Sequence, residues 1–371
     1  MNLVTPITDY LFTSQIPPLE YAQAGIDPLN VQIYGNCEVN RHRILNTTIY
    51  PVSGRIHLYD LGPLIEEDMR KDGLTESVIE VSFYSGNNRI LKTDFVAVHC
   101  PFNTNVDCAR FLANHFLSSL TAKRIPAGSS SDGERLWLNH SEEEVSAPTS
   151  YTLTAYFLTP ADTIFTLGMT LSISGNYVRT AIPVGYNAVW DACESNYVSD
   201  EYTIEEMKML YYNVTAGSRL FTYFVDYDFQ PTQRFRFNNV FNVEEMIYLD
   251  VVTVTKTDTE RSIATSHGQS LFYDQVDSQE YEVSTAPLST EEAEWAAQLL
   301  LSHKVQRVEK DGTYTDILIT DMTAEVTDSD EEHRRIKFTY RLKRQGATLS
   351  TLTETTDITR KFSAQFNNKF A

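Results

Sequence analysis

The chain has 371 residues and a formal net charge of −20, with 42% hydrophobic and 12% aromatic residues. This hydrophobic content is sufficient for packed cores, which excludes wholesale disorder, and the length corresponds to about two or three domains. The negative charge repels a phosphate backbone, so we expect no sequence-independent binding of nucleic acid.

Cysteine content and hydropathy indicate the cellular compartment in which the protein is made. The four cysteines are too few and too spread for a disulfide scaffold, so we expect free, mostly buried thiols from a reducing compartment. No run reaches the roughly 18 apolar residues of a membrane span. The first ten residues lack the basic start and apolar core of a signal peptide. We therefore expect synthesis in a cytoplasm, no export by the usual route and no membrane contact.

The first 30 residues are repeatedly interrupted by proline, at Pro6, Pro17, Pro18 and Pro28. Proline fixes φ and lacks an amide donor, which opposes regular secondary structure. We expect residues 1–30 to form an extended N-terminal arm that packs on a partner, or a loop over the first domain, with Pro17 and Pro18 as candidate contact residues. A disordered terminus is the alternative.

Residues 31–145 are predicted to form a β-rich domain with two helices. Apolar and polar residues alternate over Ser77–Tyr84, and a Gly-Asn-Asn turn connects this strand to its partner Ile90–Cys100. Helices are predicted at Leu61–Met69 and Asp107–Leu120.

Residues 146–233 are predicted to form a β-sandwich-like domain. Strand patterns occur at Tyr151–Leu158, Thr163–Ile173 and Ser218–Tyr227, with turn signals about every ten residues. This spacing of short strands is typical of a sandwich.

Residues 234–345 are predicted to form a third β domain, with a helix packed on it. Strands are expected at Met246–Thr257, Tyr314–Thr320 and Arg335–Leu342, which are rich in Val, Thr, Ile and Tyr.

The helix of this third domain is predicted over residues 289–304. Ser289 is a good N-cap, and Glu292 three residues later completes a capping box. Trp295 begins the apolar face. We expect Ser289, Glu292 and Trp295 to be structural anchors of this helix on its sheet.

Residues 346–371 are predicted to form a polar C-terminal tail. Its end carries Phe362, Phe366 and Phe370, one phenylalanine at every fourth position. Three solvated phenylalanines would be a liability, so we expect this segment to lie in a groove of a neighbouring subunit. A frayed tail is the alternative.

No catalytic or cofactor motif is present in the sequence. It contains no G-x-S-x-G, no P-loop and no G-x-G-x-x-G. The spacing of His99, Cys100, Cys108 and His115 matches no compact zinc motif, and the acidic residues 328–332 lack the glycine of an EF-hand. We therefore expect no enzyme, no cofactor and no metal.

Aromatic residues support an alternative function. Trp190, Tyr211, Tyr212, Tyr223 and Tyr227 lie near one another in the sequence. They either form core and cross-strand pairs or make a stacking platform for a surface glycan. The alternative is thus a carbohydrate-binding or adhesin-type β-sandwich module, and a β-sandwich hydrolase is the third hypothesis.

The last third of the chain resembles a known class of proteins. The resemblance rests on four segments: Phe235–Phe241 (FRFNNVF), Tyr281–Ser302 with its tryptophan, Asp316–Asp321 (DILITD) and Phe338–Arg341 (FTYR). They are similar to uncharacterised proteins that occur among virion or tail genes in phages and prophages of gut Bacteroidetes, as is the phenylalanine-bearing tail. The resemblance covers residues 234–371 and implies a structural role in a tail, baseplate or neck. It transfers no active-site residue.

These observations predict a mainly β (β-rich α+β) fold of tandem small β-sandwich-like domains, each with few helices. The predicted function is that of a structural subunit of a phage or phage-like particle, located in the virion and forming a symmetric ring. Its expected partners are copies of itself and other virion or tail proteins, which it contacts through sheet edges, the N-terminal arm and the C-terminal tail.

Overall fold

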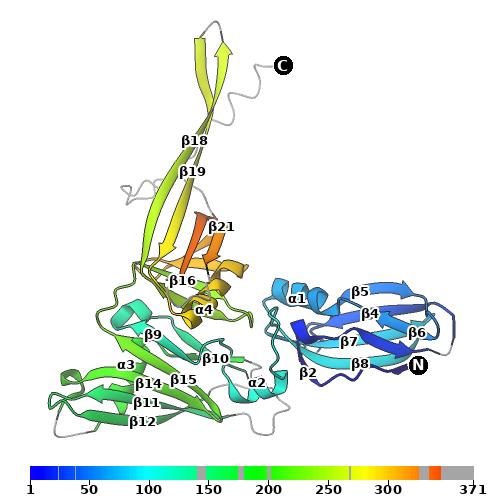
Figure 1. Cartoon of the computed structure of the whole chain (residues 1–371), viewed down its shortest axis with the longest axis horizontal. Coiled ribbons are helices and arrows are strands. Elements are labelled where there is room, and N and C mark those ends of the chain that lie inside the picture. The colour runs from blue at the N-terminus through cyan, green and yellow to red at the C-terminus, as the bar shows by residue number, and fades with distance from the viewer. Residues whose placement is uncertain are drawn as a thin grey trace.

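The computed structural model describes most of the chain. The described residues are 1–23, 25–37, 39–139, 148–173, 179–198, 202–266, 269–325 and 334–343, with the backbone alone for 258–262, 264–278 and 323–325. Strands predominate among them, and they form several sheets with few helices (Figure 1). The prediction of a mainly β fold with several β-rich units is confirmed.

The first part of the chain contains two sheets and two helices. Its elements are β1 (Asn2–Leu3), β2 (Tyr10–Phe12), η1 (Thr13–Gln15), β3 (Leu19–Ala22), β4 (Leu29–Gly35), β5 (His42–Ile49), β6 (Arg55–Leu58), α1 (Leu61–Asp72), β7 (Glu76–Ser85), β8 (Asn88–Val98) and α2 (Cys108–Asn114). The sheets have the orders β2-β8-β7-β4-β5 and β1-β3-β6. Both contribute to one core, in which the Tyr21 and Phe83 ring centroids are 4.5 Å apart.

The predicted N-terminal arm is wrong, because residues 1–30 contribute three short strands and the start of β4 to the first part. Strand β2 pairs in parallel with β8, and β3 lies between β1 and β6. Leu19 and Tyr21 are fully buried. The prolines fall between these strands, where their missing amide donors break no ladder. Pro17 is half-buried and Pro18 is exposed, directly before β3.

The second part of the chain is a five-stranded sheet covered by a strand pair and a helix. Its elements are β9 (Ala122–Pro126), η2 (Gly128–Ser131), β10 (Arg135–Asn139), β11 (Ser150–Leu158), β12 (Ile164–Ser172), β13 (Arg179–Pro183), α3 (Tyr186–Asn196), η3 (Ile204–Glu206), β14 (Lys208–Ala216) and β15 (Arg219–Asp226). The main sheet has the order β12-β11-β14-β15-β9, and β10 pairs with β13. Strand β9 joins this sheet in parallel with β15, although the expected boundary at residue 145 assigned it to the first domain.

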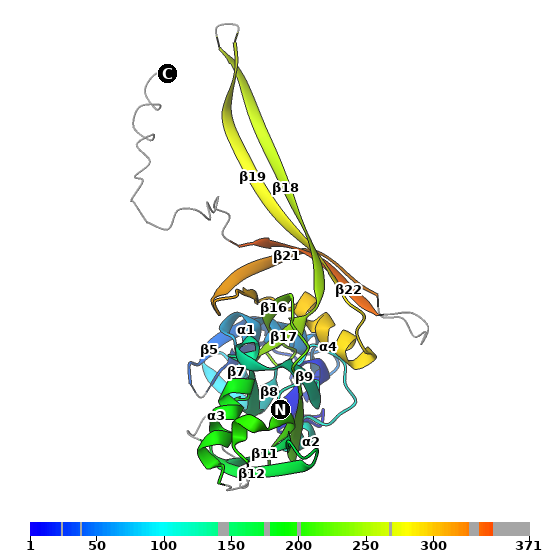
Figure 2. The same ribbon diagram turned by 90° about the vertical axis from the view of Figure 1, so that its left-hand side faces the viewer.

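The third part is a seven-stranded sheet with one helix. Its elements are β16 (Gln233–Asn238), β17 (Glu244–Leu249), β18 (Val251–Ser266), β19 (Gln269–Thr285), α4 (Thr290–Leu301), β20 (Val305–Val308), β21 (Tyr314–Glu325) and β22 (Arg335–Leu342). The strand order is β17-β16-β20-β21-β22-β19-β18. Helix α4 packs beside this sheet, as Figure 2 shows.

Helix α4 begins as its sequence predicts. The Ser289 hydroxyl accepts a hydrogen bond from the Glu292 amide, and the Glu292 carboxylate accepts one from the Ser289 amide at 3.1 Å. Trp295 is buried and packs against Phe237. The helix ends at Leu301, three residues before the predicted end, with Ser302 as its C-cap.

The turn between β16 and β17 connects the three parts of the chain. We call residues 239–243 the junction turn. The side-chain amide of Asn239 donates to the Leu117 carbonyl at 2.8 Å. The Val240 carbonyl accepts from His99 Nδ1 at 2.8 Å. Phe241 is inserted in a cluster with Phe12 and Phe111, and its ring centroid lies 5.0 Å from that of Phe111.

Asn242 makes further contacts of the junction turn, and its backbone is in the left-handed conformation, with φ of 57°. Its side-chain amide donates to the carbonyls of Met69 and Leu74, at 3.3 and 3.0 Å. Its own carbonyl lies 3.4 Å from Arg179 Nη1. One asparagine therefore joins α1 of the first part to β13 of the second.

Residues 344–371 lie outside the described residues, and so do the predicted partner-binding residues Phe362, Phe366 and Phe370. Within the described part, no helix has both the length and the apolar character required to cross a membrane.

We expect the Phe241→Ala substitution to lower the free energy of unfolding by about 3–5 kcal/mol, because it empties a buried site shared by two parts of the chain. Urea denaturation followed by circular dichroism measures this loss. Phe224→Ala is the matched control, since Phe224 is half exposed. Equal losses for the two variants would contradict the importance of the junction turn.

Candidate interaction surface

Strands β18 and β19 form a long antiparallel hairpin that projects from the molecule. They contain 16 and 17 residues. Strand β22 pairs with β19 only over Tyr281–Ser284. Beyond Thr257 and Gln279 the hairpin has two strands alone and extends away from the other elements for about 30 Å, at about 3.3 Å per residue (Figures 1 and 2).

The two edges of the seven-stranded sheet differ. At the β17 edge, the second part of the chain covers the strand: Trp137 Nε1 donates to the Glu244 carbonyl at 2.7 Å, and Lys123 Nζ donates to the Met246 carbonyl. At the other edge, β19 is the one strand that pairs with β18 among the residues that the structure describes. The sheet is therefore closed on one side and open on the other.

Exposed apolar side chains lie on β18. Val252 is 70% exposed and Val254 is 49% exposed, and their spacing of two places both on one face of the strand. Next to them, Lys256 and Glu282 form an ion pair across the hairpin. Ile263, farther out, is also exposed. A two-stranded hairpin with an open edge is marginal in water, and such edges readily accept another strand.

Two grooves flank helix α4, and we call them the α4 grooves. Both are bounded by Leu120, Glu291 and Trp295. The first has a volume of about 250 Å³ and is also lined by Phe224, Phe229, Leu249, Pro287 and Leu288. The second has a volume of about 580 Å³ and is also lined by Phe102, Thr121, Glu294, Ala297 and Gln298.

A buried ionic cluster lies beneath the first α4 groove. Lys123 Nζ donates to Glu134 Oε1 at 2.7 Å, and the Tyr248 hydroxyl donates to the other carboxylate oxygen at 2.7 Å. Trp295 Nε1 donates to Glu245 Oε2 at 2.8 Å. Burial raises the pKa of the Glu245 carboxyl, and the Lys123 charge opposes this rise. Trp295 is thus an anchor between α4 and β17, consistent with its predicted structural role.

We expect the Lys123→Met substitution to lower the free energy of unfolding by about 3–5 kcal/mol, because it leaves buried carboxylates without a cation. Urea denaturation at neutral pH measures the loss. Adding Glu134→Gln should recover part of it, since one uncompensated charge is then removed. A second substitution that worsened the loss would contradict this account.

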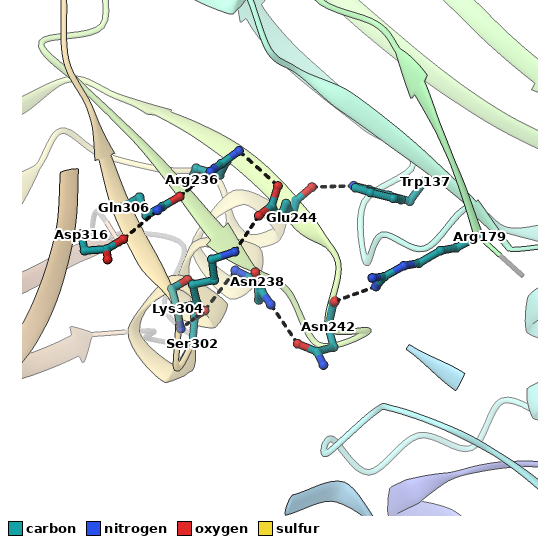
Figure 3. A network of polar contacts seen from close by, with 10 residues as sticks. All are labelled: Trp137, Arg179, Arg236, Asn238, Asn242, Glu244, Ser302, Lys304, Gln306 and Asp316. Atoms are coloured by element: carbon teal, nitrogen blue, oxygen red, sulfur yellow. Dashed lines mark hydrogen bonds and ion pairs between the residues drawn. The ribbon is translucent and has the colours of Figure 1, made fainter. Parts of the chain in front are cut away.

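A separate polar network lies at the junction of the three parts, as Figure 3 shows. Glu244 forms ion pairs with Lys304 at 2.9 Å and Arg236 at 3.2 Å. Burial opposes ionisation of Glu244, but these two cations outweigh it and hold the pKa of the carboxyl below its usual value. Asn238 donates to Asn242 at 2.9 Å. The network fixes the sheet that carries the hairpin to the junction turn.

His99, Cys100, Cys108 and His115 do not form a metal site in the part of the chain that the structure describes. Among the described residues, no group of three or more His, Cys, Asp or Glu could hold a metal ion. Cys100 and Cys108 are free and buried. Burial raises the pKa of the Cys100 thiol to about 11. The acidic residues 328–332 lie outside the described residues.

The candidate glycan platform is largely part of the core. Tyr212 and Tyr223 are fully buried and stack on each other, with centroids 5.1 Å apart. Trp190 and Tyr227 are half-buried around Tyr186. The five aromatic residues therefore do not form one exposed surface.

His99 makes the contact between the first part and the junction turn sensitive to pH. Its Nδ1 donates to the Val240 carbonyl, and burial lowers its pKa from 6.5, with nearby Arg70 adding to the effect. The folded state therefore binds fewer protons than the unfolded chain. The free energy of unfolding is highest above about pH 6.5, the pKa of an exposed histidine, and it decreases as the pH falls from there toward the lower pKa of His99 in the folded state.

We expect His99→Asn to remove part of this acid destabilisation, because asparagine keeps a donor near the Nδ1 position and does not titrate. Thermal midpoints measured from about pH 7 to 5 should fall less steeply for this variant than for the unchanged protein. His57→Asn, at an exposed position on β6, is the control. Parallel curves for His99→Asn and the unchanged protein would refute the prediction.

Comparisons with known proteins identify no family. No family model matches the chain, and no curated protein matches it. Among solved structures, the full extracellular region of plexin A4 is similar at 7% sequence identity and a TM-score of 0.17, over 91% of this chain and 39% of that one. The chain thus spans less than half the length of that structure, and a similarity at this level carries no argument about function.

Some features of this surface were not found from the sequence. The strand predicted at Met246–Thr257 is divided between β17 and β18, and β18 continues to Ser266. No prediction covered Lys123 or Asn242. The one available signal was the run of Val and Thr that begins at Val251, which favours a strand of greater length.

Proposed function

We propose that this chain is a structural assembly subunit that acts through protein–protein interfaces, with the β18–β19 hairpin as its main contact. The observation that carries the proposal is the hairpin itself, which projects beyond its own sheet and leaves the β18 edge open. At its base, Val251 and Val283 belong to the core of the third part, but beyond Thr257 and Gln279 its described backbone pairs within the hairpin alone. Its stabilisation requires another surface.

Strand addition is the mechanism that this geometry favours. The outward amides and carbonyls of β18 would pair with an edge strand of a neighbour, and Val252 and Val254 would supply apolar contact at the base of the hairpin. Contact with an edge of a different sheet in the neighbour is heterologous. Repeated contacts of this kind form a ring when the rotation closes.

The site of assembly that we propose is a phage or phage-like virion, in the tail tip, baseplate or neck. Support comes from the resemblance noted in the sequence, whose segments occupy related positions in the fold. FRFNNVF spans β16 and the junction turn, DILITD lies in β21 and FTYR lies in β22. The residues that carry the resemblance thus belong to the unit that presents the hairpin.

Shortening the hairpin tests the proposal. In one variant, Asn-Gly replaces residues 258–278, so that Thr257 and Gln279 flank a tight turn. We expect the unchanged protein to form oligomers in size-exclusion chromatography with light scattering. The shortened protein should be monomeric, with a thermal midpoint close to that of the unchanged protein, because the described backbone of the removed residues pairs within the hairpin alone.

A charge variant gives an independent measurement. Val252→Lys with Val254→Lys places two charges on the proposed contact and should shift the oligomer toward monomer, as lysine protects natural sheet edges. Val52→Lys is the control, since Val52 is 71% exposed and belongs to the first part of the chain, not to the hairpin. A monomeric unchanged protein, or an oligomer that all of these variants retain, would overturn the proposed role of the hairpin.

A further inference from the structure

The α4 grooves combine apolar walls with a charged rim. Glu291 borders both grooves and Glu294 the second, whereas the first is also lined by Asp250 and by Arg124, which pairs with Asp226. Phe224 and Phe102, one beside each groove, are 49% and 42% exposed. Glu291 and Glu294 on α4 are exposed at the rim. Among the described residues, neither carboxylate has an ion-pair partner of its own. The floor is rigid, because Trp295 is held there by its hydrogen bond to Glu245.

The last 14 residues of the sequence have the complementary chemistry. This basic phenylalanine segment, residues 358–371, contains three cationic side chains and no acidic one, in a chain whose net charge is −20. The cationic residues are Arg360, Lys361 and Lys369. Phenylalanines at every fourth position share one face in a helix and equally in a strand. In either conformation, the segment would present an apolar face flanked by positive charge.

The course of the described chain favours a groove on another copy. Strand β22 begins beside the first α4 groove, where Arg334 bridges to Leu288. It ends at Leu342, which pairs with Ile317, at the opposite end of the strand. The last described residues therefore lead away from the α4 grooves of the same copy.

We propose that the basic phenylalanine segment of a second copy docks in the α4 grooves. Its phenylalanines enter between the aromatic and aliphatic walls, and its cations face Glu291 and Glu294. This inference deepens the proposed assembly function and rests on it, because it names a second contact between copies. The contact is heterologous, since tail and groove are different surfaces of the same chain.

Cross-linking of the full chain tests this docking. One preparation carries the photoreactive residue benzoylphenylalanine in place of Phe366, and it is mixed with an isotopically heavy preparation of the unchanged protein. After irradiation, mass spectrometry should identify light-to-heavy cross-links to peptides that contain Phe224 or residues 287–297. The same probe in place of Leu352 should label these peptides at least about tenfold less.

Charge reversal provides the matched variants. Glu291→Lys with Glu294→Lys should reduce the cross-link yield about tenfold, and adding Arg360→Glu with Lys361→Glu should restore it. Restoration by opposite reversal distinguishes a docking contact from a folding defect. Yields that none of these substitutions change would refute the proposed charge pairing.

The outcomes separate this inference from the proposed role of the hairpin. Cross-links that map elsewhere, or that join light to light alone, would overturn docking between copies even if the hairpin variants behave as expected. Cross-links between copies in the grooves that persist after the hairpin is shortened would support the docking and would show that assembly does not need the hairpin.

Discussion

The junction turn is the constraint on which the rest of the structure depends. Five residues between two adjacent strands insert Phe241 into an aromatic cluster of the first part, and they place Asn242 between carbonyls of α1 and a cation of β13. The turn is itself anchored by β16 and β17, which lie in the sheet that carries the hairpin. One short connection therefore determines where the three parts meet and how firmly the projecting hairpin is held.

Buried polar groups give this junction its specificity. Asn239, Asn242 and Glu245 are all nearly inaccessible to solvent. Asn239 and Asn242 each donate and accept side-chain hydrogen bonds, and Glu245 accepts one from Trp295. A buried polar group that loses its partner costs more than an apolar contact of similar size. Displacement of the parts would thus be opposed by unpaired donors and carboxylates as well as by lost apolar contact. In the proposed assembly, a rigid base for the hairpin would reduce the entropy lost on binding a neighbour.

The sequence predicted the features that local rules determine. The capping box of Ser289 and Glu292 and the strand pair β7–β8 depend on neighbouring residues and alternation, and both were found. The short strands β1–β3 were missed because two to four residues show no period. The hairpin was missed beyond Thr257 because residues 258–266 are mostly polar and show no hydrophobic alternation. The parallel pairing of β9 with β15 and the hydrogen bonds of Asn242 to Met69 and Leu74 join residues 100 or more positions apart, which no local pattern encodes.

The asymmetry of the two edges has a consequence for how far assembly can proceed. If the β17 edge were as accessible as β18, each copy could extend the same continuous sheet at both ends, and the product would be an unlimited fibre. Trp137 and Lys123 occupy the Glu244 and Met246 carbonyls of β17, so this edge of the sheet is blocked. In the proposed assembly, copies joined through β18 would therefore not propagate a single sheet, which would favour particles of finite size over aggregates.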